Sequence, residues 1–395
     1  MDPVRNPYAP GAGQRPPELA GRDGELKAFD VVLERVARGR PERSVVLTGL
    51  RGVGKTVLLN AMRSSAVRRG WGTGKLEARP DQPLRHPLAA ALHLAVRELA
   101  NRNEDAERHV LGVLKAFAQR EPPTPRRGKA PNRWQPGIDV PAVSGRADSG
   151  DIEIDLVELL TDIAGLAADV GKGVAIFIDE MQDLLPDDVS ALCASCHEMS
   201  QRGTSLVVVG AGLPHLPAVL SASKSYSERL FRYARIDRLD RAAANAALRR
   251  PALDEDADFA DGALDAMYER TAGYPYFVQA YGKVAWDVAP TSPITAADVA
   301  VAAPEAESEL AVGFFGSRYE RATPAEREYL RAMAELDGDD QPVPTAAVAE
   351  VLRRNPQSLS PARDALLKKG LVYSGQRGQI AFTVPHFANF LRKQD

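Results

Sequence analysis

Apolar residues along this chain follow two patterns, which alternate over roughly the first half of the sequence. Short uninterrupted apolar runs are typical of buried parallel strands, whereas apolar residues spaced three and four apart predict helices. The predicted strands lie at residues 45–47, 71–78, 174–178, 205–209 and 233–237. Helical spacing fills the intervals, with one helix capped by Asp23 and another that begins at Lys55. Strands that alternate with helices predict an α/β fold with a parallel sheet.

The next part of the chain shows helical spacing only. Helices are predicted at residues 240–250, at 261–271, after the break Gly273-Tyr274-Pro275, and from Thr295 and again from Pro304 to about residue 322. This pattern predicts a small all-helical domain.

A third pattern occupies the C-terminal part of the chain. The predicted elements are helices at 323–336, 345–354 and 360–370 and a hairpin with strands at 371–373 and 380–384. Thr323 and Glu326 form a capping box for the first helix, and Ser360-Pro361 opens the third. Three helices and a hairpin predict a winged helix, in which the third helix enters a DNA groove and the hairpin flanks it.

These changes in pattern divide the chain into four parts. Residues 1–20, rich in Pro and Gly, predict a flexible, poorly ordered arm. The predicted domains are a sheet domain at 21–238, a helical lid domain at 239–322 and a winged-helix domain at 323–395. Within the sheet domain, residues 120–150 contain six prolines and no long periodicity, which predicts a surface insertion.

Composition narrows the class of protein. The chain has 395 residues, 44% of them hydrophobic and 26% charged, and a net charge of −3. Any nucleic-acid or anionic-membrane surface must therefore be local. Two cysteines cannot build a disulfide framework, and no apolar run approaches the roughly 20 residues of a membrane span. Because the first residues also lack the apolar core of a signal peptide, we expect a cytoplasmic protein without membrane contact.

The sequence GLRGVGKT connects the first predicted strand to the helix that follows it. Glycines without Cβ atoms let successive backbone N–H groups converge on polyphosphate oxygens, and the helix N-terminus adds favourable partial charge. Lys55 supplies a charge for the β and γ phosphates of ATP, and the Thr56 hydroxyl is placed to bind Mg²⁺. The predicted nucleotide-binding residues of this phosphate loop and its helix start are Gly49, Leu50, Arg51, Gly52, Val53, Gly54, Lys55, Thr56 and Val57.

Two carboxylates end the strand VAIFIDE. In an open parallel sheet ligands bind beyond the carboxyl ends of the strands, so Asp179 and Glu180 are expected near the phosphate loop. One acid there can hold Mg²⁺, the role predicted for Asp179, and the second can orient the attacking water, the role predicted for Glu180. Paired acids after a strand also occur as helix caps, but the phosphate loop favours the catalytic interpretation.

Cys193, Cys196 and His197 match a haem-attachment pattern. Both cysteines, however, belong to an apolar stripe at helical spacing. We therefore interpret them as core residues.

The chain resembles the archaeal-type ATPases of the AAA+ and STAND grouping, which are similar to origin-recognition initiator ATPases. The resemblance rests on LAGRDGEL (19–26), GLRGVGKT (49–56), FIDEMQDL (177–184), YSERLF (226–231) and AGYPYF (272–277). It implies that Arg22 frames the adenine, that Arg229 acts on the γ-phosphate, and that Pro275 begins a lid helix over the nucleotide. One departure is the strand end VVVGAGLP, which lacks the polar sensor residue usual in initiator ATPases.

Acidic and basic residues are concentrated in different halves of the C-terminal part. From residue 351 onward there are eight Lys or Arg against two acidic residues, whereas residues 323–350 contain two basic and seven acidic residues. The basic half contains the predicted third helix and the hairpin, which are the elements that contact DNA in a winged helix. This favours double-stranded DNA as the partner. The candidate DNA-binding residues are Ser360, Arg363, Lys368, Lys369 and Arg377.

These features predict a Mg-dependent ATPase that acts as a nucleotide-controlled switch for a DNA-binding winged helix. Arg229, if supplied by a neighbouring subunit, makes hydrolysis depend on a homo-oligomer. Two alternatives stay open: a signalling scaffold whose winged helix binds protein, and a small-molecule kinase that uses the same loop.

Overall fold

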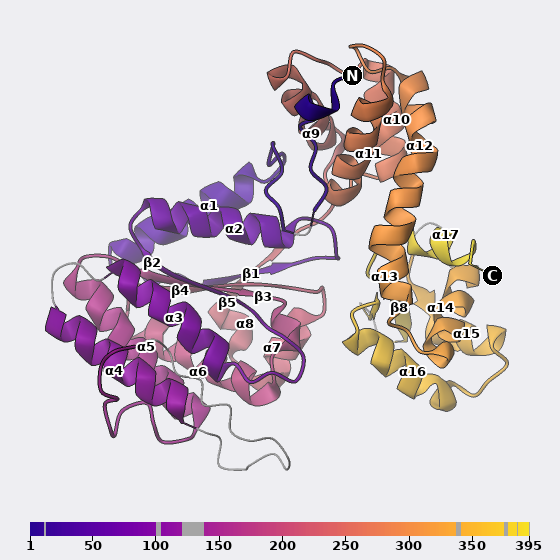
Figure 1. The fold of residues 1–395 in the computed structure, drawn as a ribbon. Coiled ribbons are helices and arrows are strands. Elements are labelled where there is room, and N and C mark those ends of the chain that lie inside the picture. The colour runs from indigo at the N-terminus through magenta and orange to yellow at the C-terminus, as the bar shows by residue number, and fades with distance from the viewer. Residues whose placement is uncertain are drawn as a thin grey trace.

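The computed structural model describes residues 1–11, 13–99, 104–120, 138–336, 341–374, 378–384 and 386–394. A parallel sheet of five strands, in the order β2-β3-β4-β1-β5, forms the centre of the N-terminal half (Figure 1). The strands are β1 (Ser44–Thr48), β2 (Gly72–Glu77), β3 (Val174–Asp179), β4 (Leu206–Gly212) and β5 (Phe231–Arg235). The predicted α/β fold with a parallel sheet is confirmed. The prediction for the last strand started two residues late, because buried Phe231 already pairs with Ser44.

Helices cover both faces of the sheet. Alternate strand residues point to opposite faces, so Val45 and Leu47 pack in one core with α1 and α2, while Val46 packs in the other with α3 to α8. Figure 1 shows these two layers. The helices are α1 (Asp23–Ala37), α2 (Lys55–Arg68), α3 (Arg85–Leu99), α4 (Glu104–Gln119), α5 (Ile152–Asp169), α6 (Pro186–Gln201), α7 (Leu216–Ser223) and α8 (Ser227–Leu230).

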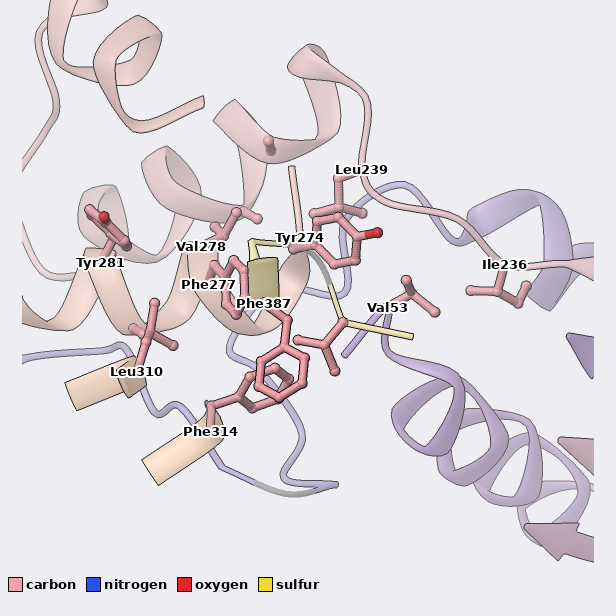
Figure 2. Packing of buried hydrophobic residues seen from close by; sticks show 14 of the residues in the cluster. Val53, Ile236, Leu239, Tyr274, Phe277, Val278, Tyr281, Leu310, Phe314 and Phe387 are labelled. Carbon is pink, nitrogen blue, oxygen red and sulfur yellow. The ribbon is translucent and has the colours of Figure 1, made fainter. Parts of the chain in front are cut away.

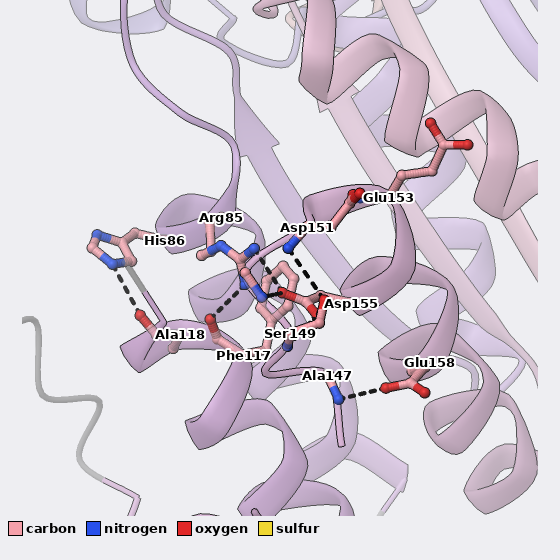
Figure 3. Close-up of polar contacts among 11 residues, drawn as sticks. Arg85, His86, Phe117, Ala118, Ala147, Ser149, Asp151, Glu153, Asp155 and Glu158 are labelled. Atoms are coloured by element: carbon pink, nitrogen blue, oxygen red, sulfur yellow. Dashed lines mark hydrogen bonds and ion pairs between the residues drawn. The ribbon is translucent and has the colours of Figure 1, made fainter. Parts of the chain in front are cut away.

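A buried ion pair anchors the described end of the predicted insertion (Figure 3). Arg85 of α3 and Asp155 of α5 lie 2.9 Å apart, with side chains 8% and 0% exposed. Asp155 also accepts hydrogen bonds from Ser149 and from the Gly150 N–H, which fixes the turn before α5. The Arg85 guanidinium lies over the Phe117 ring. Residues 121–137 of the predicted insertion lie outside the described residues.

A helical module follows the sheet. Its helices are α9 (Arg241–Asp254), α10 (Asp261–Thr271), α11 (Pro275–Val288) and α12 (Ala296–Leu310), and a π-helical turn (Ala311–Gly316) and α13 (Ser317–Tyr319) continue from α12. The prediction of a new helix at Pro304 was wrong. Thr295 and Asp298 form a capping box, and the helix passes through Pro304 because Val299, Ala302, Ala303, Ala306 and Leu310 are buried along it.

The N-terminal arm is extended but anchored, which corrects the expectation of a poorly ordered segment. Tyr8 is buried against the helical module, and its hydroxyl donates a 2.5 Å hydrogen bond to the Leu248 carbonyl. The Trp286 indole donates to the Asp2 carbonyl, and Arg5 pairs with Glu255. An aromatic side chain in this Pro- and Gly-rich stretch therefore joins the core of α9 and α11.

The C-terminal module contains the predicted helices and hairpin together with a short extra strand. Its elements are α14 (Pro324–Leu336), β6 (Val343–Pro344), α15 (Thr345–Val351), α16 (Pro356–Lys368), β7 (Val372–Tyr373), β8 (Gln379–Phe382) and α17 (Phe387–Leu391), and the antiparallel strand order is β6-β8-β7. The capping box of Thr323 and Glu326 is present at the start of α14. None of the helices in the described part of the chain is long and apolar enough to span a membrane.

Two boundaries in this module were predicted wrongly. Helix α16 begins at Pro356 and not at Ser360, because the Asn355 side chain caps it by accepting from the Gln357 N–H. Helix α15 ends at Val351 and not at residue 354, since Arg353 has a φ of 51°, outside the helical region.

The Arg85–Asp155 pair yields a prediction about stability. Removing one partner of a buried pair leaves an uncompensated charge, so Arg85→Ala is expected to lower the free energy of unfolding by about 3 kcal/mol. Arg146 pairs with Asp162 on the same segment but is 38% exposed, so Arg146→Ala is expected to cost at most about 1 kcal/mol. Urea unfolding of both variants provides the measurement, and equal losses would contradict the anchoring role of Arg85.

Candidate functional site

The phosphate loop connects β1 to α2 at the carboxyl edge of the sheet. Gly52 and Gly54 have φ values of 83° and 90°, in the left-handed region that favours glycine. Gly49 lies so close to Ile236 that a Cβ atom would be 2.2 Å from its carbonyl oxygen. Backbone geometry alone therefore requires glycine at these three positions. The first N–H groups of α2 have no partner within the helix, which favours an anion at this edge.

Lys55 is folded back onto the loop. Its Nζ donates to the carbonyl oxygens of Gly49 and Leu50 at 2.9 and 2.8 Å. Burial lowers the pKa of Lys55 to about 8, although the carboxylates of Glu180 and Asp179 act in the opposite direction. A phosphate at the loop would replace the two carbonyl acceptors with a charged one.

The two predicted acids lie at the same edge as the loop. Asp179 is the last residue of β3 and is 5% exposed, and its Oδ1 accepts from the Glu180 N–H at 3.0 Å. Arg51 of the loop reaches across the edge, with its Nη1 3.2 Å from Oε1 of Glu180. The fold thus brings Lys55, Arg51 and both acids together, as the motif spacing predicted.

Gln182 is a polar residue that the sequence interpretation missed. Its Nε2 donates to Oε2 of Glu180 at 2.6 Å, and its Oε1 accepts from the Leu213 N–H at 3.0 Å. Gly212 makes room for it, since a Cβ there would be 2.7 Å from Oε1 of Gln182. The turn after β3 therefore places a polar side chain between Glu180 and the end of β4. Gln182 belongs to the motif FIDEMQDL, whose spacing from Asp179 and Glu180 is the sequence signal for it.

Arg22 is tied to the loop backbone. Its guanidinium donates to the carbonyl oxygens of Val53, at 3.1 Å, and Asp237. Burial lowers the pKa of Arg22. This arginine joins the start of α1 to the loop and to the segment after β5. The sequence predicted only a contact with adenine for Arg22 and not this structural role.

The remaining predicted nucleotide residues lie around the start of α2. Thr56 and Val57 belong to its first turn, and Gly13 of the N-terminal arm passes Thr56 so closely that a Cβ would be 3.1 Å from Cγ2. Asn60 donates a hydrogen bond to the Gly13 carbonyl. Pro275 is the first residue of α11, as predicted for the lid helix.

The C-terminal module contacts the phosphate loop directly. The Arg51 N–H donates to the Thr383 carbonyl at 3.2 Å, and the Arg51 Nε donates to the Gly370 carbonyl at 3.2 Å. Gly370 has a φ of 62°, and a Cβ there would be 2.6 Å from Nη2 of Arg51. No sequence pattern indicated this contact.

Aromatic residues complete the contact between loop, helical module and C-terminal module. A Cβ on Gly52 would touch the Phe314 ring, which stacks on Tyr276 with 4.7 Å between centroids. Figure 2 shows Val53 of the loop, Phe314 and Phe387 in one buried cluster. The loop is therefore covered by side chains of two other modules.

Arg318 is a second residue that sequence reasoning missed. Its guanidinium lies over the Phe314 ring, 4.0 Å from the centroid. Burial lowers the pKa of Arg318 to about 10, with further contributions from the neighbouring Arg51 and Arg321. It places a second, partly exposed cation close to Arg51 of the loop, and no motif marked it.

Arg229 lies at the opposite edge of the sheet from the phosphate loop of its own chain. It precedes β5, whose first residue pairs with Ser44, whereas the loop follows Thr48. Four steps of about 3.3 Å along β1 separate the two edges by roughly 13 Å. Within one chain Arg229 therefore does not reach the loop. Its side chain is exposed on the surface of the chain.

Two candidate DNA-binding residues are engaged within the chain. Arg363 pairs with the adjacent Asp364 at 3.0 Å. Lys369 lies 2.6 Å from the Glu326 carboxylate and also donates to the Arg321 carbonyl, so that it joins α16 to the start of α14.

The other three candidates differ in position. Ser360 lies inside α16 and donates to the Pro356 carbonyl of its own helix. Lys368 is exposed at the end of α16. Arg377 lies outside the described residues.

Cys193 and Cys196 are both free and buried in α6. Burial raises the pKa of their thiols to about 11 and about 12, which disfavours the reactive thiolate. This confirms their interpretation as core residues.

Comparison with known families identifies two segments. Residues 18–209 match the family model described as AAA ATPase domain. Residues 312–391 match a domain of unknown function, DUF8462. A comparison with curated proteins finds no match.

Solved structures are similar over nearly the whole chain. The Walker-type ATPase of Pyrococcus abyssi has a TM-score of 0.61 and 15% identity, with 96% of this chain and 97% of that chain covered. The RuvB Holliday junction branch migration motor of Thermotoga maritima has a TM-score of 0.47 and 17% identity, with 94% and 96% covered. The Orc1 protein of Aeropyrum pernix, solved in complex with DNA, has a TM-score of 0.43 and 15% identity, with 96% and 94% covered. At such identity the likeness to the Pyrococcus ATPase shows the fold alone.

Proposed function

We propose that ATP at the phosphate loop controls the docking of the C-terminal module in this chain, whose residues 18–209 match the model of the AAA ATPase domain. The observation that carries this proposal is the set of contacts around the loop. Arg51 binds the carbonyls of Gly370 and Thr383, and Gly52 lies under Phe314. A triphosphate that enters the loop must displace or rearrange these groups, and its γ-phosphate can then hold a different arrangement until hydrolysis.

The roles of the site residues follow from their chemistry. Lys55 turns from its carbonyl acceptors to the β and γ phosphates, the N–H groups from Leu50 to Val57 bind the phosphate oxygens, and Glu180 accepts the proton of the attacking water. Pro275 and Arg22 belong to the nucleotide-facing ends of the lid helix and of α1. We keep the predicted domain limits, with the lid at 239–322 and the winged helix at 323–395.

Magnesium fits the oxygen ligands at this edge. Thr56 supplies a hydroxyl and Asp179 a buried carboxylate, both suited to this cation. Among the described residues no group of three or more His, Cys, Asp and Glu could hold a metal by itself. Mg²⁺ would therefore depend on phosphate oxygens for the rest of its ligands, and when bound it neutralises charge that develops on the transferred phosphoryl group.

The partner of the C-terminal module is proposed to be double-stranded DNA, because its last 45 residues are strongly basic and Lys368 is exposed on α16. The second candidate is a signalling scaffold in which this module binds protein. It is favoured by the internal pairing of Arg363 and Lys369. A small-molecule kinase gives no role to the contact between the loop and the C-terminal module, and phosphate release without an acceptor would argue against it. Arg229 is proposed to act on the nucleotide of a second copy in a homo-oligomer.

The pKa of Lys55 yields a prediction about pH. In the free protein this pKa is about 8, and a bound phosphate raises it, so the complex binds more protons than the free protein above pH 8. ATP affinity is therefore expected to fall as pH rises from 8 to 10, by up to tenfold per unit. Calorimetric titration provides the measurement. Lys55→Ala should abolish binding, and wild-type affinity in this variant would refute the site.

Glu180→Gln is expected to keep ATP bound and to stop turnover, because an amide cannot accept the proton of water. Single-turnover hydrolysis and equilibrium binding in the presence of Mg²⁺ separate the two effects. Turnover within twofold of the wild type would show that another group acts as the base.

Salt dependence separates DNA binding from protein binding. DNA affinity is expected to fall steeply between about 50 and 200 mM salt and to weaken for Lys368→Ala, since phosphate contacts release counterions. Lys369→Ala is the matched control, because it is expected to destabilise the α14–α16 contact instead of removing a phosphate contact. Negligible binding of the wild type to duplex DNA at low salt would favour the scaffold.

A further inference from the structure

Arg51 contacts both the C-terminal module and Glu180. Its N–H and its Nε donate to Thr383 and Gly370, while its Nη1 lies 3.2 Å from Oε1 of Glu180. The Arg51 side chain is 27% exposed and that of Glu180 is 23% exposed, so the pair is only partly open to solvent. A planar guanidinium with donors in a fixed fork can hold two such acceptors in one geometry.

Glu180 has a donor on each carboxylate oxygen. Arg51 contacts Oε1 and Gln182 contacts Oε2. A base that is to take a proton from water must offer an oxygen to that water. Each oxygen keeps a second lone pair, so water is not excluded, but the two side chains fix the direction in which the proposed base faces.

We propose that Arg51 is a positioning residue that couples docking of the C-terminal module to the release of Glu180. While Gly370 and Thr383 lie on the loop, Arg51 is held against Oε1 of Glu180 and fixes the orientation of this carboxylate. When the module leaves, Arg51 loses two acceptors and Glu180 becomes free to face the nucleotide. This inference rests on the proposed role of Glu180 as the base.

Two neighbouring residues, Gly370 and Arg318, limit the positions that the Arg51 side chain can take. Gly370 has no Cβ, and one would lie 2.6 Å from Nη2 of Arg51, so glycine is needed for this approach. Arg318 lies close enough for its charge and that of Arg51 to repel each other. Arg51 is thus held between an attractive carboxylate and a repelling cation.

The chain offers a matched control. Gln182 contacts the other oxygen of Glu180 but bonds on its far side to Leu213 of the sheet domain, not to the C-terminal module. Gln182→Ala therefore frees one oxygen of the carboxylate without removing a docking contact. Arg51→Ala frees the other oxygen and also removes the docking contact with Gly370.

The experiment measures docking and turnover in the full chain. Spin labels at Arg68→Cys in α2 and Gln357→Cys in α16 report the distance between the modules, because both positions are exposed while the native cysteines are buried. Without nucleotide, Arg51→Ala is expected to raise the undocked fraction about tenfold, since the charge-assisted hydrogen bond to the Gly370 carbonyl is lost while the backbone N–H to Thr383 is kept. Glu180→Gln is expected to raise it in the same direction, and the double variant no further than Arg51→Ala. Gln182→Ala is expected to stay docked.

Arg51→Ala is expected to raise kcat for ATP hydrolysis severalfold. Gln182→Ala is expected to leave docking unchanged. A purely structural Arg51 would instead lower kcat. The inference is overturned if Glu180→Gln leaves docking unchanged, if Gln182→Ala undocks the module as strongly as Arg51→Ala, or if kcat of Arg51→Ala falls. A wild type that neither binds nor hydrolyses ATP would refute the proposed function, whereas the docking measurements without nucleotide would still decide whether Arg51 couples the module to Glu180.

Discussion

The loop between β1 and α2 is in contact with every module of the chain, and its close backbone approaches make this possible. Gly49 lies against the Ile236 carbonyl, Gly52 lies under Phe314, and the Arg51 N–H reaches Thr383. A Cβ atom at Gly49 would clash with the Ile236 carbonyl, and one at Gly52 would already be in contact with the Phe314 ring at 3.4 Å. The proposed nucleotide would need donors of this loop, such as the Arg51 N–H, that bind the C-terminal module here, and for this reason we propose that nucleotide binding and module arrangement are linked.

The parts of this structure that sequence predicted are those fixed by local rules. Strands, sheet helices and the phosphate loop follow from apolar periodicity and from glycine and helix-start chemistry, which operate within a few residues. Asp179 and Glu180 were placed correctly because parallel strands end at a common edge. The errors at Pro304 and Ser360 arose where a local helix signal was overridden, in one case by burial along α12 and in the other by the stronger cap at Asn355.

What sequence could not predict depends on contacts between distant residues. Arg51 and Thr383 are 332 positions apart, and no pattern in either segment indicates that they meet. Gln182 takes its position from Leu213, which follows β4, and Arg318 lies near Arg51 although 267 positions separate them. Tyr8 joins the helical module from a segment whose composition alone predicts disorder. These residues decide how the modules are held together.

The distance between α2 and the C-terminal module in the presence of nucleotide tests the central claim most directly. The chain labelled at Arg68→Cys and Gln357→Cys is compared with Mg²⁺ and saturating ADP or a non-hydrolysable ATP analogue, with binding of each nucleotide measured on the same sample. The account predicts a longer-distance population with the analogue that is small or absent with ADP. The same distance distribution with both nucleotides bound would contradict it.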